Sequence, residues 1–288
     1  MESQRNRRNF LIGTAAFCGG LLLPVAPTVA ATFTPSRFSV EVTGAGPDVI
    51  LIPGLASSRQ VWRRTIAAIP GYRYHLVQIA GFTGEPVRDN IAGPVVAGVA
   101  EQLALYIASR GLKAPAVVGH SMGATIALEL ALRHPDTVGK VMVVDMLPQP
   151  SGMRGSTPDE VRPLADNLLA IAEAPQGRAL VGALAGLFGP SGDPALQSDP
   201  DVVARSLHEL ATTDLRPQLA HLKVPVTVVY ACASPRIGPE VDRVFAAAYR
   251  GARQVKLVRI DDSSHFIMGD QPAAFRRAMR AFLSDSSG

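Results

Sequence analysis

Residues 116–128 read Ala-Val-Val-Gly-His-Ser-Met-Gly-Ala-Thr-Ile-Ala-Leu, and this stretch decides the fold. A short apolar run rich in β-branched residues ends in Gly-x-Ser-x-Gly, and a helical pattern begins directly afterwards. This is the setting of a nucleophile elbow, a sharp strand-to-helix turn that exposes the serine hydroxyl, here that of Ser121. Gly119 and Gly123 fit such an elbow because a side chain would obstruct the tight turn and the close helix–strand approach. The alternative is a plain glycine-rich turn.

The composition indicates a globular protein without a nucleic-acid partner. The chain has 288 residues, of which 47% are hydrophobic and 18% are charged, enough for one large α/β domain or two small ones. Of the net charge of +4, Arg5, Arg7 and Arg8 against Glu2 contribute +2, which leaves about +2 on the rest. The sequence also lacks a basic stripe interleaved with aromatic residues, so nucleic acid is not expected as a ligand.

The first 31 residues have the organisation of an export signal. Arg7 and Arg8 precede Phe10-Leu11, an apolar run continues to Leu23, and small residues follow at 28–31. The paired arginines before Phe-Leu resemble the twin-arginine signal, which carries folded proteins across the bacterial inner membrane. The sequence therefore predicts a signal peptide over residues 1–31, recognition by the export machinery, and a periplasmic or secreted protein.

Two other readings of this N-terminal segment fit less well. A transmembrane anchor is disfavoured because the apolar run is short and rich in glycine and alanine. A lipoprotein site is disfavoured because Phe17, not a small residue, precedes Cys18. After cleavage only Cys232 would remain, and one cysteine cannot form an internal disulfide. We expect no stable membrane span in the mature protein.

The remainder of the chain alternates predicted strands and helices. Runs of four or five apolar residues between helices predict a mostly parallel sheet that is covered by helices on both faces. The predicted strands are Phe38–Val42 at an edge, Val49–Ile52, Tyr74–Gln78, Ala116–Val118, Val141–Val144, Val226–Tyr230 and Val255–Ile260. The predicted helices are Trp62–Ile69, Val95–Ser109, Ala124–His134 and Pro272–Leu283.

Residues 148–216 interrupt this alternation, because they show only helical patterns between breaks rich in proline and glycine. An insertion that follows the strand ending at Val144 would lie over the carboxyl ends of the strands, where ligands bind in open α/β sheets. We expect a helical cap whose leucine and alanine residues, with Met153 and Phe188, cover an apolar pocket. The alternative is that the helices extend the core. The cap would divide the core into residues 32–147 and 217–288. The three helical patterns are Asp159–Ala172, Arg178–Leu187 and Asp201–Leu210.

Together, the strand order, the elbow, a Pro-Gly loop after an early strand and a late histidine resemble the α/β-hydrolase superfamily, from Phe38 to the C-terminus. This resemblance implies an α/β-hydrolase fold and a catalytic triad with Ser121 as nucleophile and His265 as general base. A serine hydroxyl is a poor nucleophile until an imidazole accepts its proton. His265 lies between the last predicted strand and the final helix, as the superfamily's base does, whereas the other histidines, including His120, fit less well. The alternative for His265 is a surface-loop histidine.

The resemblance also implies an oxyanion hole built from two backbone N–H groups, those of Leu55 and Met122. Members of the superfamily more commonly have His-Gly in the loop after the early strand, where this chain has Pro53-Gly54. The change from His-Gly to Pro-Gly need not impair the oxyanion hole, because the donor is a main-chain N–H group. The alternative, an ordinary Pro-Gly turn, is compatible with that role.

The acid of the triad departs from the superfamily's common pattern. That acid usually follows the strand after the cap, but here the turn reads Ala-Cys-Ala-Ser-Pro, and Ser234 stands where an aspartate is expected. Asp242 lies well into the next helix, and Asp261 and Asp262 are too close in sequence to the histidine. Asp145, 24 residues after the nucleophile, remains, and some members of the superfamily place their acid after this earlier strand. The alternative for Asp145 is a helix-capping or turn residue.

These observations predict a serine hydrolase that cleaves carboxylic esters of small to medium apolar substrates through an acyl-enzyme. The same triad also serves C–C bond hydrolases, peptidases and perhydrolases, and a hydrolase-like fold can serve as a non-catalytic ligand-binding protein. A dehalogenase or epoxide hydrolase is disfavoured because those enzymes need an aspartate in place of Ser121. No cofactor is expected, because the sequence has no His-x-x-x-His, no cysteine pair and no phosphate-binding glycine loop with lysine.

Overall fold

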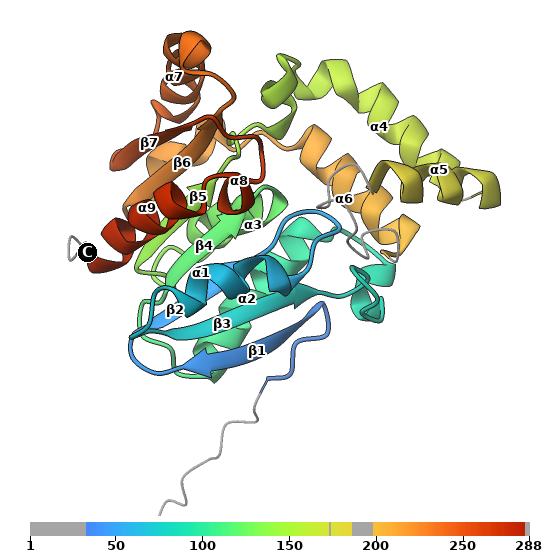
Figure 1. The fold of residues 1–288 in the computed structure, drawn as a ribbon. Coiled ribbons are helices and arrows are strands. Elements are labelled where there is room, and N and C mark those ends of the chain that lie inside the picture. Colours follow the sequence, from blue (N-terminus) through green and yellow to red (C-terminus); the bar gives the residue numbers. More distant parts are fainter. Residues whose placement is uncertain (1–32, 173, 186–197, 286–288) are drawn as a thin grey trace, which may run out of the picture. The chain divides into compact units, whose positions relative to one another are not determined.

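The computed structural model describes residues 33–172, 174–185 and 198–285. The predicted export signal, residues 1–31, and Phe188 lie outside the described residues. The described chain forms a seven-stranded sheet in the order β1-β3-β2-β4-β5-β6-β7 (Figure 1). The strands are β1 Phe38–Gly44, β2 Asp48–Ile52, β3 Arg73–Ile79, β4 Ala116–His120, β5 Lys140–Val144, β6 Val226–Cys232 and β7 Val255–Asp261.

The sheet is parallel except for β1, which pairs antiparallel with β3 at the edge. The carboxyl ends of the parallel strands meet at one edge of the sheet. In this register His120 lies opposite Val144, so the residues that follow β4 and β5, Ser121 and Asp145, leave the sheet side by side. All seven predicted strands are confirmed, most of them with a residue or two added at an end.

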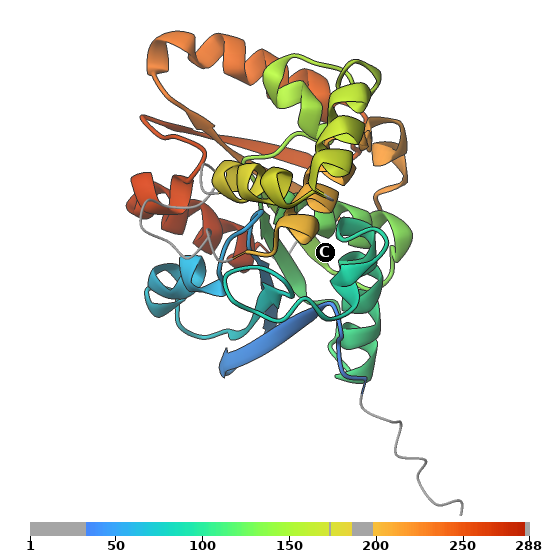
Figure 2. The same cartoon turned by 90° about the vertical axis from the view of Figure 1, so that its right-hand side faces the viewer.

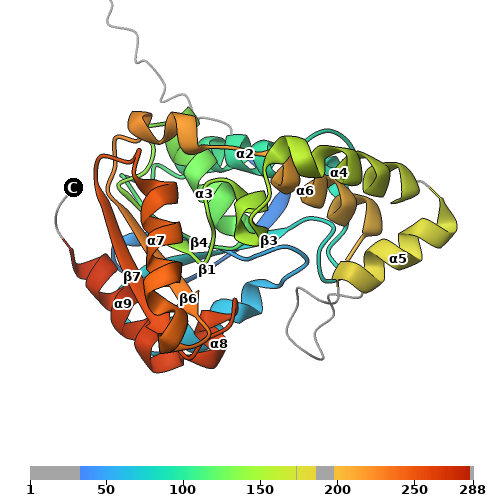
Figure 3. The ribbon, with the colours of Figure 1, turned by 90° about the horizontal axis from the view of Figure 1, so that it is seen from above.

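Helices cover both faces of the sheet, as predicted. Val117 packs into the core on one face and its neighbour Val118 into the core on the other, which explains why the strands are apolar without alternation. Figure 3 shows α2 and α3 on one side of the sheet and α8 and α9 on the other. The core helices are α1 Arg63–Ala67, α2 Val96–Ser109, α3 Met122–Arg133, α7 Gly238–Tyr249, α8 Ile267–Asp270 and α9 Pro272–Ser284. None of the helices in the described part of the chain is both long and apolar enough to cross a bilayer.

The insertion between β5 and β6 is helical, which confirms the predicted helical insertion. It contains α4 Pro158–Ala172, α5 Pro175–Ala185 and α6 Pro200–Thr212, which lie together beside the sheet (Figures 1 and 2). The N–H of Leu215 donates to the carbonyl of Pro148 at 2.9 Å, so the two ends of the insertion meet. Met153, expected on the inner face, has 41% of its surface exposed.

The cap is attached to the core mainly through α6. The carboxylate of Glu209 accepts hydrogen bonds from the N–H groups of Val95, Val96 and Ala97, each at 2.8 Å. These groups lie at the N-terminus of α2, where free N–H groups and the helix dipole favour a negative charge. One carboxylate thereby satisfies three backbone donors and holds α6 against the core.

Candidate active site

Ser121 occupies the turn between β4 and α3 in a strained backbone conformation, with φ 53° and ψ −122°. A residue with a side chain adopts such angles at a cost, and the surrounding contacts must hold it there. The N–H of Ser121 donates to the carbonyl of Val144 at 2.9 Å, and its own carbonyl accepts from the N–H of Ala124 at 2.8 Å. The side chain of Ser121 is half-buried beside the N-terminus of α3.

The two glycines of the elbow are required by close backbone contacts. A Cβ atom on Gly119 would lie 2.1 Å from the carbonyl oxygen of Gly123, and one on Gly123 would lie 2.3 Å from that of Ile52. Both separations are far inside van der Waals contact. The first confirms the tight turn that the sequence predicts, and the second confirms the close approach of α3 to the neighbouring strand β2.

Asp145 and His265 are in direct contact, although 120 residues separate them in the chain. The Nδ1–H of His265 donates to Oδ2 of Asp145 at 2.7 Å, and the N–H of Ala231 donates to Oδ1 at 2.8 Å. Asp145 is only 4% exposed, whereas the side chain of His265 is 40% exposed. A buried carboxylate is tolerated when its oxygens are hydrogen-bonded, and here each of the two has a donor.

Two of the three other acids considered from the sequence are engaged elsewhere. Asp242 and Asp261 both form ion pairs with Arg259, at 2.6 and 2.7 Å. Ser234, which stands where the common pattern has its aspartate, accepts the N–H of Arg236 at the start of a short helical turn. Asp145 is therefore the acid that the structure brings to the imidazole.

The loop after β2 lies against the nucleophile. A Cβ atom on Gly54 would be 3.2 Å from the Cβ of Ser121, so the backbone just before Leu55 borders the serine side chain. Met122 follows Ser121 directly and begins α3. Among the described residues, none accepts a hydrogen bond from the N–H of Leu55 or of Met122. The two predicted oxyanion donors thus belong to the residue after Ser121 and to the loop that borders it, and no described residue accepts a hydrogen bond from either.

His120, which precedes the nucleophile, supports the loop of His265. It is buried, its Nε2–H donates to the carbonyl of His265 at 2.9 Å, and the two imidazole rings lie 4.8 Å apart. Burial, and secondly the neighbouring His265, lower the pKa of His120 to about 3, so its ring is neutral. Sequence reasoning missed this role, although a polar residue at the end of an apolar strand is a signal that a partner is needed.

The site offers no obvious place for a metal. Within the described ranges, no group of three or more His, Cys, Asp or Glu side chains is placed to bind a metal ion. The arrangement instead provides a hydroxyl in a strained turn, an imidazole oriented by a carboxylate, and free backbone donors.

Comparisons with known proteins show the family and the fold of the chain. The sequence model of the alpha/beta hydrolase family matches residues 49–278. The pimeloyl-[acyl-carrier protein] methyl ester esterase of Vibrio cholerae is 27% identical over 261 residues, covering 85% of this chain and 97% of the relative.

Two solved esterases share the fold, each at 20% identity. The esterase of Exiguobacterium antarcticum has a TM-score of 0.68 and covers 86% of this chain and 96% of its own. A thermophilic esterase of Thermogutta terrifontis has a TM-score of 0.66, with coverages of 85% and 92%. Because the family match spans well over half of the sequence, this chain belongs to the alpha/beta hydrolase family and is a hydrolytic enzyme.

Proposed function

We propose that the protein is a serine esterase that cleaves carboxylic esters of small to medium apolar substrates through an acyl-enzyme. The observation that carries the proposal is the 2.7 Å contact between Asp145 and His265, at the edge of the sheet where Ser121 lies half-buried in the elbow. An imidazole held by a carboxylate in this way can accept and return a proton, and Ser121 leaves the sheet next to Asp145.

The proposed reaction follows from which atoms are free. Because Asp145 binds Nδ1 of His265, the Nε2 atom is the one left to accept the proton of Ser121 as its oxygen attacks the ester carbonyl. The N–H groups of Leu55 and Met122 would stabilise the negative charge on the carbonyl oxygen. The imidazolium then protonates the leaving alcohol, and a water activated by the same imidazole releases the acid from Ser121.

The relatives support an ester over other acyl compounds as the substrate. The Vibrio cholerae relative is named for a methyl ester of an acyl chain, and both cited structural neighbours are esterases. The proposed substrates are esters with apolar acyl groups, because the sequence predicts an apolar pocket beneath the cap.

A panel of p-nitrophenyl esters of increasing acyl length tests the proposal. We expect wild-type protein to hydrolyse the shorter members and the variant Ser121→Ala to lose several orders of magnitude in kcat, about 10⁶-fold, while remaining folded. Substantial turnover by Ser121→Ala, with the pH profile of the wild type, would contradict the proposal. Absence of turnover by the wild type on every ester would favour a ligand-binding role.

We further propose that residues 1–31 direct export of the folded enzyme to the periplasm. The support is the pair Arg7-Arg8 followed by Phe10-Leu11 and an apolar run. Replacing both arginines by lysine should leave full-length precursor in the cytoplasm, measured by fractionation and immunoblotting. Unchanged periplasmic delivery of this double variant would count against a twin-arginine signal.

A further inference from the structure

Gln78 is a buried amide near the carboxyl end of β3. It lies in β3 among Leu76, Val77 and Ile79, and only 3% of its surface is exposed. A buried amide is costly unless its polar atoms are bonded. The hydrogen bonds of Gln78 therefore indicate what this residue holds in place.

The amide of Gln78 forms hydrogen bonds with the loop that follows β2. Its Oε1 accepts from the N–H of Arg59 at 2.9 Å, and its Nε2 donates to the carbonyl of Ser57 at 3.2 Å. Leu55 lies in the tight turn that the N–H of Ser57 closes onto the carbonyl of Gly54 at 3.3 Å. A displacement of this turn would move the Leu55 N–H relative to Ser121.

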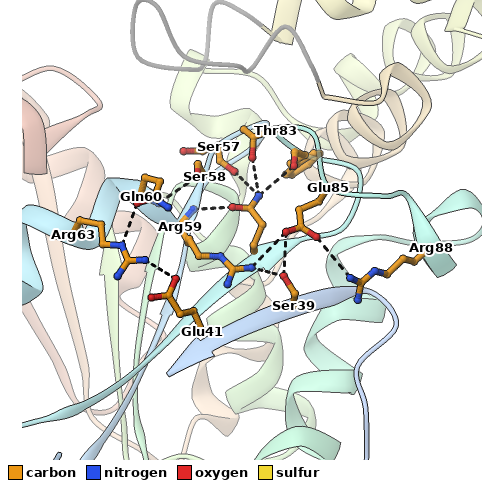
Figure 4. Close-up of polar contacts among 12 residues, drawn as sticks. Ser39, Glu41, Ser57, Ser58, Arg59, Gln60, Arg63, Thr83, Glu85 and Arg88 are labelled. Atoms are coloured by element: carbon orange, nitrogen blue, oxygen red, sulfur yellow. Dashed lines mark hydrogen bonds and ion pairs between the residues drawn. The ribbon is translucent and has the colours of Figure 1, made fainter. Parts of the chain in front are cut away.

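The same amide forms hydrogen bonds with the turn that follows β3. Its Nε2 protons are shared with the carbonyl of Phe82 at 3.3 Å and with Oγ1 of Thr83 at 3.0 Å. Figure 4 shows Ser57, Arg59 and Thr83 close together in this network. The Gln78 side chain thus connects the loop after β2 to the turn after β3.

The turn after β3 also contacts Ser198 and Asp199, the residues of the cap that precede α6. The N–H of Thr83 donates to the hydroxyl of Ser198 at 3.1 Å, and the N–H of Asp199 donates to the carbonyl of Gly81 at 2.7 Å. Gly81 has φ +89°, and a Cβ atom there would lie 2.7 Å from the side chain of Val202 in α6. The contacts form a continuous path from the cap through Gln78 to the loop beside the nucleophile.

We propose that Gln78 is a positioning residue of the esterase site. Its amide fixes the Leu55 N–H in the oxyanion hole and ties that donor to the turn that carries the cap. The inference rests on the proposed function, because the position of the Leu55 N–H matters only if an oxyanion forms beside Ser121. Gln78 acts through the backbone of the loop and does not touch the substrate.

The variant Gln78→Met tests this role because it keeps the volume of the side chain and removes its hydrogen bonds. We expect kcat and kcat/KM for a p-nitrophenyl ester to fall together by about 10²-fold. The reason is that a misplaced donor weakens binding of the transition state but not binding of the substrate. A trifluoromethyl ketone with the same acyl chain should lose the same factor in affinity, since its adduct with Ser121 carries an oxyanion.

A matched control separates positioning from general loss of stability. Gln102, on α2, accepts the N–H groups of Ser36 and Arg37 at 2.9 Å and donates to the Ser36 hydroxyl, far along the chain from the Leu55 loop. Gln102→Met should lower the melting temperature but leave kcat within about twofold of the wild type. An equal loss of kcat in Gln102→Met would overturn the inference.

A second variant covers the case in which Gln78→Met does not fold. Gln78→Glu at pH 8 keeps the shape and the acceptor for Arg59 but loses the donor to Ser57, so kcat should again fall by about 10-fold or more. A folded variant at position 78 whose kcat stays within threefold of the wild type overturns the inference. If Ser121→Ala is inactive in that same assay, the esterase proposal stands; inactive wild type would instead refute the esterase proposal itself.

The connection to the cap is tested by Ser198→Ala in both backgrounds. In the wild type, loss of the hydroxyl that binds Thr83 should lower kcat by about threefold. In Gln78→Met the same change should have a clearly smaller effect, because the hydrogen bonds through Gln78 are already lost. Equal factors in the two backgrounds would overturn the connection between the cap and the oxyanion loop.

Discussion

The ends of β5 and β6 differ in chemistry although they lie side by side. The two strands are parallel neighbours with Val144 opposite Val229, so both end at the edge that carries Ser121. β5 is followed at once by the buried carboxylate of Asp145. The end of β6 has small uncharged residues instead, and Ala231 offers its backbone N–H to that same carboxylate at 2.8 Å.

In the proposed triad the acid follows β5, whereas the superfamily's common position is after β6. The imidazole needs a single anion, and the carboxyl end of either strand faces the loop that carries His265. The end of β6 remains a support, because the carbonyl of Cys232 accepts the N–H of Ser263 at 3.2 Å and so holds the start of that loop. In the proposed mechanism β5 supplies the charge and β6 supplies its backbone donors and acceptors.

The largest effect should come from Asp145→Asn. The amide keeps the size of the side chain and an acceptor for Ala231, but it cannot fix the tautomer of His265 or stabilise the imidazolium, so kcat should fall by about 10³–10⁴-fold. Ester kinetics measure the loss, and thermal unfolding checks the fold. Near-wild-type turnover in Asp145→Asn, with a loss in Asp261→Asn or Asp262→Asn, would show that the assignment to β5 is wrong.

An intermediate effect is expected at the end of β4, on stability in acid. The folded-state pKa of His120, about 3, is below the ordinary value of 6.5. Between these values the unfolded chain binds the extra proton, so the stability from neutral His120 is present above pH 6.5 and is lost as pH falls, by up to about 1.4 kcal/mol per unit.

His120→Gln should remove that contribution, while the new amide can still donate to the His265 carbonyl. The free energy of unfolding, measured by urea titration at several pH values, should then depend less steeply on pH between 6 and 4 than in the wild type. An unchanged slope would mean that His120 does not stay neutral in the folded enzyme.

The smallest effect should come from Ser234→Ala, at the end of β6. Among the described residues, the Ser234 side chain has one hydrogen bond, accepted from the N–H of Arg236 at 3.4 Å, which is long and lies on an exposed turn. We expect kcat within about twofold of the wild type, measured on the same ester, since surface changes of this kind are nearly neutral. A tenfold loss would mean that the end of β6 takes part in catalysis.

Much of the fold could be predicted because its signals are local. The apolar strands, the glycines of the elbow and Pro135 after α3 follow from residues that are neighbours in the chain. Asp145 could be proposed because the other candidate acids were set aside by their place in the chain, and some members of the superfamily carry their acid after this strand.

The supporting contacts could not be predicted, because they join residues that the sequence does not relate. The bond from His120 to His265 spans 145 residues, and that from Ala231 to Asp145 spans 86. The carboxylate of Glu209 meets the N-terminus of α2 only once the cap has docked. For Gln78, the sequence shows a polar residue in a strand, but its partners depend on how two loops pack above β3.

The rate at which a fluorophosphonate labels the protein tests the central claim most directly, namely that Ser121 is activated by His265 held by Asp145. Peptide mass spectrometry locates the adduct. We predict one adduct per chain on Ser121 in the wild type, labelling slower by about 10³–10⁴-fold in Asp145→Asn, and an unchanged rate in Ser234→Ala. An adduct on another residue, or labelling of Asp145→Asn as fast as that of the wild type, would contradict the claim.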